Sequence, residues 1–359
     1  MGLPMELNSA RKQIDQIDEQ IVALINRRAQ LALDIGAAKN AASRATYAPD
    51  REHEVLENVK AAGRGGPLAD RQITAIYRQI ISACRSLERA LKVAYMGPPA
   101  SFTHQAALER FGENTELVAV TSIPDTFTEV TRGSVDFGVV PVENSTEGPV
   151  QETLDHFVDS ELRICAEIVL PIAFQLLSRA ERSNIARVYT NPVALGQCRQ
   201  WLAKNLPGVE VVTVVSTSRA AATAAEDPTG AALANTLAAT EYGLNIVDHD
   251  VQDLAANYTR FYVIAPSTAS QPTGSDKTAI AFSIRDRVGA LRDVVDIFTR
   301  RGINMSSIQS RPSKRRVWDY VFFVEFAGHE AEPNVSEALH ELEAHTIFVK
   351  VLGSWPVDS

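Results

Sequence analysis

Two sets of side chains in this chain are suited to binding and transforming a small anion. The first comprises Arg11, Arg28 and Lys39, three cations spaced along one face of a predicted N-terminal helix. Guanidinium and ammonium groups pair well with carboxylates. The second is a row of short polar side chains, Glu143 to Glu147, which directly follows the apolar segment 138–142. Such a row offers hydrogen-bond donors and acceptors to a ligand.

The three cations lie in or beside an apolar seam that predicts one long helix over residues 7–39. Two rows repeat every seven residues, namely Leu7, Ile14, Ile21 and Ile35, and then Ala10, Ile17, Leu24, Leu31 and Ala38. Arg28 takes a position of the first row. Because an unpaired buried guanidinium is costly, Arg28 requires an anionic partner from the protein or from a ligand. Arg11 and Lys39 border the seam, and the alternative is that both are solvated flank residues.

Two further helices are predicted before residue 92. One begins near Pro49 and carries Arg51 and Glu52, and the other runs over residues 68–91. The apolar face of the latter includes Cys84, which we place among the substrate-binding residues. Glu88 follows one turn later, close to the same face.

From residue 92 the pattern changes to alternating strands and helices. Strands are predicted over 92–96, 117–121 and 136–142, with helices over 105–111 and 123–132 between them. This alternation predicts a parallel sheet, and such sheets bind ligands at the carboxyl ends of their strands. Glu143, Asn144 and Ser145 stand at such an end. The alternative is an ordinary loop in which Asn144 or Ser145 caps the next helix.

Two more regions follow. A second set of strands and helices within 164–265 predicts another α/β lobe, with a ligand cleft between the lobes. After a linker at 267–275, strands over 278–284, 303–311, 317–326 and 347–352 and helices over 290–300 and 335–343 give the order βαββαβ, which is that of a ferredoxin-like domain.

Composition narrows the class of protein. The net charge is −9, and residues 1–90 hold 13 Lys and Arg against 11 Asp and Glu, whereas the remainder holds 22 against 33. An acidic chain is a poor nucleic-acid binder. No apolar run reaches the roughly 18 residues of a membrane span. The three cysteines and seven histidines lack metal-site spacing. We therefore expect a cytoplasmic protein without a metal site or a membrane span.

Residues 1–91 resemble the all-helical chorismate mutase family at the cations above, at the Arg51–Glu52 pair and at position 88. The resemblance implies an intertwined homodimer in which Arg11 reaches the partner's site. It implies that Arg11 and Arg28 hold the two carboxylates of chorismate and that Lys39 and Glu88 contact the ether oxygen of the breaking bond. Glu52 would take the ring hydroxyl, with Arg51 in support.

Two departures from that family affect the expected chemistry. Ala48 stands where some members have aspartate, and Glu88 stands where others have glutamine. The rearrangement is pericyclic, so catalysis comes from holding the reactive conformation and stabilising charge on the ether oxygen. Glutamate donates a hydrogen bond only when it is protonated. We therefore predict that the mutase rate falls as pH rises.

Residues 92–267 resemble prephenate dehydratase in the turn at 97–103, in VPVENSTEG, in the Gln197–Cys198 pair and in the N-x-TRF motif at 257–261. The architecture implied is two-lobed, similar to that of periplasmic binding proteins. The family places Thr259 at the leaving hydroxyl, and Arg260 beside it would be available for a substrate carboxylate. The residues expected to line the cleft are Ser101, Thr103, Glu143, Asn144, Ser145 and Gln197.

The dehydratase chemistry leaves one point open. Prephenate loses carbon dioxide and hydroxide, and a threonine hydroxyl is too weak an acid to protonate the leaving group alone. Either a water or Glu143 would assist Thr259. One further departure is Thr190-Asn191-Pro192, where the family commonly shows Ser-His-Pro.

The C-terminal residues resemble an ACT domain, an amino-acid-binding module. The segment at 289–292 and Gln309-Ser310-Arg311-Pro312 match its phenylalanine-binding signatures, with Gln309 in place of the usual glutamate. The residues implied in L-phenylalanine binding between two subunits are Gly289, Ala290, Leu291, Asn304, Met305, Gln309, Ser310, Arg311 and Pro312. Binding there would bias the dehydratase toward an inactive state.

The sequence thus predicts three domains, an all-α chorismate mutase domain (1–91), a two-lobed α/β dehydratase domain (92–267) and an α+β regulatory domain (276–359). We expect chorismate and prephenate as substrates, no cofactor, L-phenylalanine as an allosteric inhibitor and a homodimer or higher homo-oligomer. Two alternatives are a preference for arogenate over prephenate and a central solute-binding module without catalysis.

Overall fold

The computed structural model describes residues 7–41, 48–254, 256–266, 271–312 and 320–357, apart from the side chains of 39–41. Contacts divide the chain into two compact units. The first unit holds described residues up to 48, together with 55–91 and 111–116, and the second unit holds the rest. Part of the predicted linker, 267–270, lies outside the described residues.

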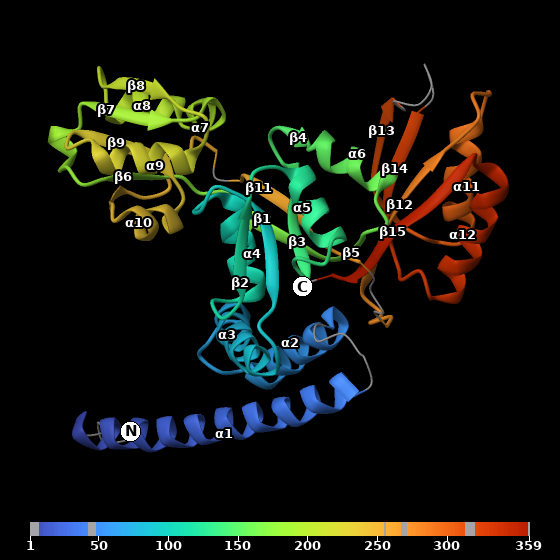
Figure 1. The fold of residues 1–359 in the computed structure, drawn as a ribbon, viewed down its shortest axis with the longest axis horizontal. Helices are drawn as coiled ribbons and strands as arrows, with labels where there is room; N and C mark the ends of the chain where they lie inside the picture. Colours follow the sequence, from blue (N-terminus) through green and yellow to red (C-terminus); the bar gives the residue numbers. More distant parts are fainter. Residues whose placement is uncertain (1–6, 42–47, 255, 267–270, 313–319, 358–359) are drawn as a thin grey trace. The chain divides into compact units, whose positions relative to one another are not determined.

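The first unit is helical, as predicted. Its helices are α1 (Leu7–Ala41), α2 (Pro49–Gly63, whose first residues belong to the second unit) and α3 (Asp70–Glu88) (Figure 1). Helix α1 packs against α3 at Gly36, where an added Cβ would lie 2.7 Å from Cγ of Glu88. The large apolar side chains of the α1 seam remain 46–66% exposed in the single chain, and they are Leu7, Ile14, Ile17, Ile21, Leu24, Leu31 and Ile35.

In the second unit, a first lobe is built on a sheet with the strand order β2-β1-β3-β11-β5. Its strands are β1 (Lys92–Met96), β2 (Glu116–Val120), β3 (Phe137–Asn144), β5 (Arg163–Pro171) and β11 (Tyr258–Ala265), with β4 (Gly148–Pro149) beside β3; its helices are α4 (Phe102–Phe111), α5 (Ile123–Thr131) and α6 (Gln151–Asp159). Strands β1 and β3 are parallel, as predicted. Strand β11 runs antiparallel between β3 and β5, so the sheet is mixed and not wholly parallel.

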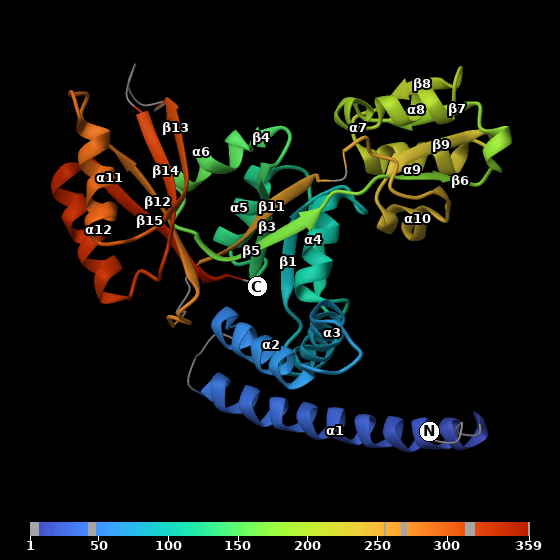
Figure 2. The same ribbon diagram turned by 180° about the vertical axis from the view of Figure 1, so that it is seen from behind.

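The second lobe has its own sheet, with the order β10-β6-β9-β7-β8. The elements are β6 (Gln175–Ser178), a 3-10 turn (Arg182–Asn184), β7 (Arg187–Thr190), α7 (Pro192–Gln197), α8 (Arg199–Asn205), β8 (Glu210–Thr213), α9 (Thr217–Glu226), β9 (Gly230–Ala234), α10 (Thr236–Tyr242) and β10 (Asn245–Asp248) (Figure 2). Ala220, Ala221 and Ala224 of α9 are fully buried in one cluster with Ala232 and Ala234 of β9. Small side chains thus let helix and sheet approach closely.

The C-terminal domain has the predicted ferredoxin-like order. It comprises β12 (Asp276–Ser283), α11 (Ala290–Arg300), β13 (Met305–Pro312), β14 (Tyr320–Ala327), α12 (Pro333–His345) and β15 (Phe348–Pro356), in the sheet order β13-β14-β12-β15. Both helices pack on one face of the sheet, around Phe282, Phe298 and Phe326 (Figure 1). Part of the third predicted strand, 317–319, lies outside the described residues.

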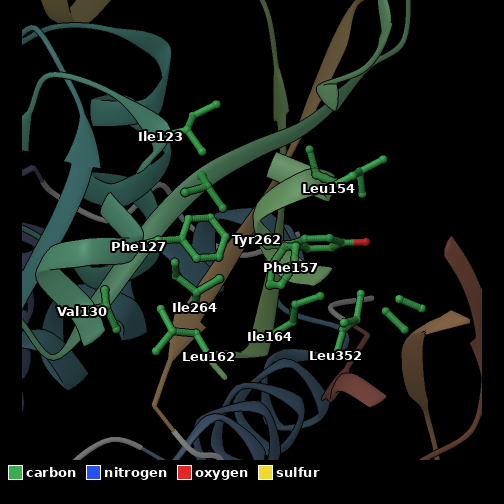
Figure 3. Packing of buried hydrophobic residues seen from close by; sticks show 14 of the residues in the cluster. Ile123, Phe127, Val130, Leu154, Phe157, Leu162, Ile164, Tyr262, Ile264 and Leu352 are labelled. Atoms are coloured by element: carbon green, nitrogen blue, oxygen red, sulfur yellow. The ribbon is translucent and has the colours of Figure 1, made fainter. Parts of the chain in front are cut away.

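The other face of the C-terminal sheet packs against the first lobe. One buried cluster contains Phe127, Phe157 and Tyr262 of the lobe together with Phe323 and Trp355 of the C-terminal domain. Figure 3 shows how Phe127, Phe157 and Tyr262 meet within this cluster. Burying a large apolar side chain stabilises the fold by roughly 1.5–3 kcal/mol, so this packing ties the two parts together. No helix among the described ranges is long and apolar enough to cross a membrane.

Candidate functional site

Strands β3 and β11 bring Asn144 and Thr259 together, as their positions at the strand ends require. The two residues are cross-strand partners. Nδ2 of Asn144 donates to Oγ1 of Thr259 at 2.8 Å and to Oδ1 of Asn257 at 3.1 Å. Because the oxygen of Thr259 accepts this bond, its own hydrogen is left to donate to a ligand. Thr259 as a whole is half-buried.

The polar row after β3 folds into a loop that is fixed to β11. Oδ1 of Asn144 accepts from the backbone N–H groups of Thr146 (2.9 Å) and Glu147 (3.1 Å), an Asx-type turn. The backbone N–H of Ser145 donates to the carbonyl of Tyr258 at 2.9 Å, and its Oγ accepts from the N–H of Tyr258 at 3.0 Å. The helix-cap alternative is wrong for this row, because the N-cap residue of α6 is Val150.

Gln197 joins this arrangement from the second lobe. Its Oε1 accepts from Nδ2 of Asn257 at 2.8 Å, and its Nε2 donates to Oγ1 of Thr146 at 3.2 Å. We call these connected residues the Thr259 network, and its members are Asn144, Ser145, Thr146, Gln197, Asn257 and Thr259. Asn257 and Thr146 were not selected from the sequence. The signal for Asn257 was its position two residues before Thr259, since alternate strand residues share a face.

Ser101 has a structural role at the start of α4. Its Oγ donates to the carbonyl of Met96 at 3.0 Å and accepts from the N–H of His104 at 3.2 Å. Nδ1 of His104 accepts from the N–H of Ala100 at 2.9 Å, and its ring stacks on Tyr95. Burial lowers the pKa of His104, which favours the neutral form that this bond needs. Thr103 is buried beside them, and ligand contact by Ser101 or Thr103 stays a prediction.

Arg260 is not available for a substrate carboxylate in this structure, so that expectation is corrected. Its Nη1 donates to Glu143 at 2.8 Å, its Nε to Glu167 at 2.5 Å and its Nη2 to Glu325 at 2.6 Å. The physical reason is strand alternation. Thr259 and Arg260 are consecutive in β11, so their side chains leave opposite faces of the sheet.

The expectation that Glu143 lines the cleft is corrected for the same reason. Glu143 is the cross-strand partner of Arg260, whereas its neighbour Asn144 is the partner of Thr259. Its carboxylate therefore lies on the face away from the Thr259 network. On the Arg260 side, burial acts to raise the pKa of Glu167, but Arg260 and Lys277 outweigh burial and hold that pKa below its ordinary value. Glu167 is thus kept ionised.

The predicted mutase residues differ in how exposed they are. Arg11 is exposed on α1 and Arg28 is half-buried on the same helix. Lys39 belongs to α1, but its side chain lies outside the described residues. Arg51 forms a surface ion pair with Glu54 at 2.5 Å, with both side chains at least 60% exposed.

The other predicted mutase residues on α2 and α3 are less exposed than Arg11 and Arg51. Glu52 is buried, and Nη1 of Arg110 lies 3.9 Å from its carboxylate, so Glu52 faces a cation of α4. Cys84 is buried, and its thiol is not part of a disulfide. Glu88 is half-buried on α3, with its methylene groups against Gly36 of α1. A contact between Glu88 and substrate stays a prediction.

The predicted phenylalanine-binding residues divide between two sides of the C-terminal sheet. Gly289 (φ 81°) precedes α11, followed by buried Ala290 and by Leu291, which is 36% exposed. Asn304 is exposed, as are Ser310 and Pro312, and Met305 is half-buried. Gln309 and Arg311 pair with Phe323 and Val321 of β14, whose side chains belong to the face packed on the first lobe.

Arg311 therefore points to the first lobe, and its expected role in the amino-acid pocket is corrected. Its Nε lies 3.0 Å from Oδ1 of Asp155 and its Nη2 donates to Oδ2 at 3.1 Å. Asp155 belongs to α6, the helix that follows the loop of the Thr259 network. One hydrogen bond, from Nη2, and one close ionic contact, at Nε, thus hold Arg311 to Asp155.

Comparison with known families covers most of the chain. Residues 10–89 match chorismate mutase type II, residues 93–269 match prephenate dehydratase and residues 278–344 match the ACT domain. Among solved structures, a prephenate dehydratase from Arthrobacter aurescens in complex with L-Phe has a TM-score of 0.69 at 34% identity, covering 74% of this chain and 90% of that one. A protein described as a novel type of quorum quenching acylase, GqqA, also has a TM-score of 0.69, at 25% identity, covering 74% of this chain and 98% of that chain.

A curated relative extends over nearly the full length. The bifunctional chorismate mutase/prephenate dehydratase of Aquifex aeolicus is 48% identical over 355 residues, which is 98% of each protein. The Pseudomonas aeruginosa protein of the same name is 39% identical over 358 residues, again 98% of each. With mutase and dehydratase segments joined in the same order, this chain belongs to the bifunctional chorismate mutase/prephenate dehydratase family.

Proposed function

We propose that this chain makes phenylpyruvate from chorismate in two successive steps of phenylalanine biosynthesis and that L-phenylalanine inhibits the second step. The observation that carries the dehydratase part is the bond from Asn144 to the oxygen of Thr259. This bond fixes the hydroxyl and turns it into a donor. A positioned donor is what departure of a hydroxide requires.

In the dehydratase step, the bond from the ring to its carboxylate breaks and releases carbon dioxide. The electron pair of that bond enters the ring, and the C–O bond to the ring hydroxyl breaks as the ring becomes aromatic. Thr259 donates a hydrogen bond to the departing oxygen. Because Glu143 faces Arg260 instead, we assign the assisting role to a bound water and not to Glu143. The water gives a proton to the departing oxygen, and the hydroxide left in its place leaves to solvent.

The mutase step needs no proton transfer to carbon, because bonds form and break in one cycle. Arg11 and Arg28 would bind the two carboxylates, and Lys39 and Glu88 would stabilise charge on the ether oxygen. Glu52 and Arg51 would complete this site once the ring hydroxyl is bound. Cys84, which is buried, would form part of the wall of this site.

The exposed seam of α1 supports a homodimer. Leaving large apolar side chains 46–66% exposed along one helix is unfavourable, and half-burying each against a second copy would contribute about 1 kcal/mol. Sedimentation of the wild type and of Ile21→Glu tests this. We expect a dimer or larger oligomer that dissociates in the variant, with mutase activity lost. A monomeric, fully active wild type would refute it.

Inhibition by phenylalanine is supported by the ACT match at 278–344 and by the related dehydratase described in complex with L-Phe. The test supplies chorismate and follows phenylpyruvate in base, with and without L-phenylalanine. We expect phenylalanine to lower phenylpyruvate formation and to leave chorismate consumption unchanged. Equal rates with and without phenylalanine would contradict it.

Two finer points belong to the same proposal. Parallel assays with prephenate and arogenate decide which substrate is preferred, and we expect prephenate. Cytoplasmic location is supported by three cysteines that are buried and unpaired, as is usual in a reducing compartment. The domain boundaries 1–91, 92–267 and 276–359 complete the proposal, and limited proteolysis tests them.

A further inference from the structure

A buried group of charges joins the C-terminal sheet to the strand that carries Thr259. Each of the three nitrogen atoms of the Arg260 guanidinium binds a different carboxylate. Nη1 binds Glu143 of β3, Nε binds Glu167 of β5 and Nη2 binds Glu325 of β14. Two of these carboxylates come from the first lobe and the third comes from the regulatory domain.

The group is closed by two further polar contacts. The hydroxyl of Tyr262 donates to Oε1 of Glu325 at 2.5 Å, and Nζ of Lys277 donates to Oε2 of Glu167 at 2.9 Å. Figure 3 shows the Tyr262 ring within the apolar cluster, with its oxygen at one end. We call Glu143, Glu167, Arg260, Tyr262, Lys277 and Glu325 the Arg260 cluster.

The centre of the Arg260 cluster is largely shielded from water, whereas Glu143 and Lys277 at its edge are 32% and 26% exposed. The side chains of Glu325 and Glu167 are 10% and 9% exposed, and that of Arg260 is 19% exposed. Removing Glu325 leaves Glu143 and Glu167 to balance Arg260 and Lys277, but it takes away the acceptor of Nη2 of Arg260 and of the Tyr262 hydroxyl. Donors that lose their partner at such burial are costly, and the remaining groups rearrange. The position of Arg260 therefore depends on a carboxylate that the C-terminal domain supplies.

The Arg260 cluster and the Thr259 network occupy opposite faces of the same two strands. In the register of β3 and β11, Thr259 pairs with Asn144 and Arg260 pairs with Glu143. The register shifts between Arg260 and Phe261, so regular pairing is interrupted directly after these two pairs. A shift of Arg260 toward or away from Glu143 thus moves the peptide that holds Thr259.

We propose that Glu325 is a positioning residue for the dehydratase. It holds Arg260 against Glu143 on one face of the sheet and thereby fixes Thr259 relative to Asn144 on the other. In addition, and resting on the proposed inhibition by phenylalanine, Glu325 is the group through which the ligand state of the C-terminal domain reaches the dehydratase site. Each contact in this connection is an ion pair between a carboxylate and the guanidinium of Arg260.

The test compares Glu325→Gln and Glu325→Ala with Glu330→Gln. Glu330 also links the C-terminal domain to the first lobe, through Arg163 at the far end of β5, where Arg163 pairs with Ala265. Without phenylalanine, we expect kcat for prephenate to fall several-fold in Glu325→Gln and more than tenfold in Glu325→Ala. KM should change less than threefold, mutase activity should persist, and Glu330→Gln should stay within twofold of wild type throughout.

A wild-type kcat in both Glu325 variants, or an equal loss in Glu330→Gln, overturns the positioning role. Thermal unfolding identifies a variant that fails to fold, and if Glu325→Ala fails then Glu325→Gln, which keeps the volume, decides the question. A smaller fraction of folded protein would also lower the apparent kcat and leave KM unchanged. The dehydratase rate is therefore expressed relative to the mutase rate of the same sample, and a fall in that ratio separates positioning from a general loss of folded protein.

The regulatory part has its own measurement. Calorimetric titration of L-phenylalanine should give dissociation constants within threefold for wild type and Glu325→Gln, while the fraction of dehydratase activity that saturating phenylalanine removes falls sharply in the variant. Unchanged inhibition of Glu325→Gln overturns the coupling. A wild type that neither binds nor responds to phenylalanine refutes the proposed regulation, and the kcat comparison then judges the positioning role alone.

Discussion

Replacement of Thr259 by valine isolates the chemical role of one hydroxyl group. Valine keeps the branched shape of threonine and removes only the oxygen. That oxygen accepts the 2.8 Å bond from Nδ2 of Asn144, and Nδ2 keeps a second acceptor, Oδ1 of Asn257, at 3.1 Å. Since Thr259 is half-buried and its partner remains satisfied, the cost to stability is about 1 kcal/mol.

The expected cost to the reaction is larger than the cost to the fold. A preorganised donor to a departing or developing oxyanion contributes about 3–4 kcal/mol to the transition state, or a factor of roughly 10² to 10³ in kcat. We therefore expect Thr259→Val to lose at least 99% of its dehydratase activity, and Thr259→Ala likewise. The residues proposed for the mutase site lie on other elements, so chorismate consumption should remain at the wild-type rate.

The assay follows chorismate loss and, after addition of base, phenylpyruvate absorbance. Thr128→Val is the matched control, because it removes a hydroxyl that donates to the carbonyl of Pro124 at 2.9 Å within α5, outside the Thr259 network. The control should keep both activities. A Thr259→Val enzyme within threefold of the wild-type dehydratase rate would refute the reasoning, and joint loss of both activities would indicate a folding defect.

Three further predictions concern pH and packing. Mutase activity should fall as pH rises, because Glu88 donates only when protonated, and Glu88→Gln should flatten the pH–rate profile; a flat wild-type profile would contradict the role of Glu88. Burial lowers the pKa of His104 from its usual 6.5, so the folded state favours the neutral ring, and the stability this gives is present above pH 6.5 and is lost as pH falls below it. Melting temperatures of wild type and His104→Gln at pH 5 and 7.5 check this, the variant being expected to show the weaker dependence and an equal dependence counting against it. In Gly353→Ala, the new Cβ would lie 2.1 Å from the carbonyl oxygen of Ile164, so we expect a loss of at least 1–3 kcal/mol in the unfolding of the second unit, whereas wild-type stability in denaturant titration would argue against the close approach.

The sequence was sufficient for the local elements and for the families. The heptad seam of α1, the alternation of strands and helices after residue 92 and the βαββαβ order of the C-terminal domain are all local patterns, and the structure confirms each of them. Periodicity reports which side of an element is apolar, so it predicts type and extent well. It also located Asn144, at the end of a strong apolar strand, whereas Thr259 was located by the resemblance to prephenate dehydratase.

Tertiary structure decided the direction of β11, which sequence periodicity does not encode. An antiparallel strand inserted between β3 and β5 brings residues 258–265 beside 137–144, although more than a hundred residues separate them. Only that pairing places Asn144 at Thr259 and Glu143 at Arg260. It also brings Gln197 of the second lobe to Asn257.

The polar row after β3 shows the division most clearly. By itself, the sequence determined that Glu143 and Asn144 end a buried strand and that Thr259 and Arg260 begin another. It did not determine that Arg260 and Glu143 turn away from the Thr259 network, toward Glu325 of the C-terminal domain. Adjacent residues of a strand alternate between the faces of a sheet, and which face meets the network and which meets the C-terminal domain depends on packing between segments far apart in the chain.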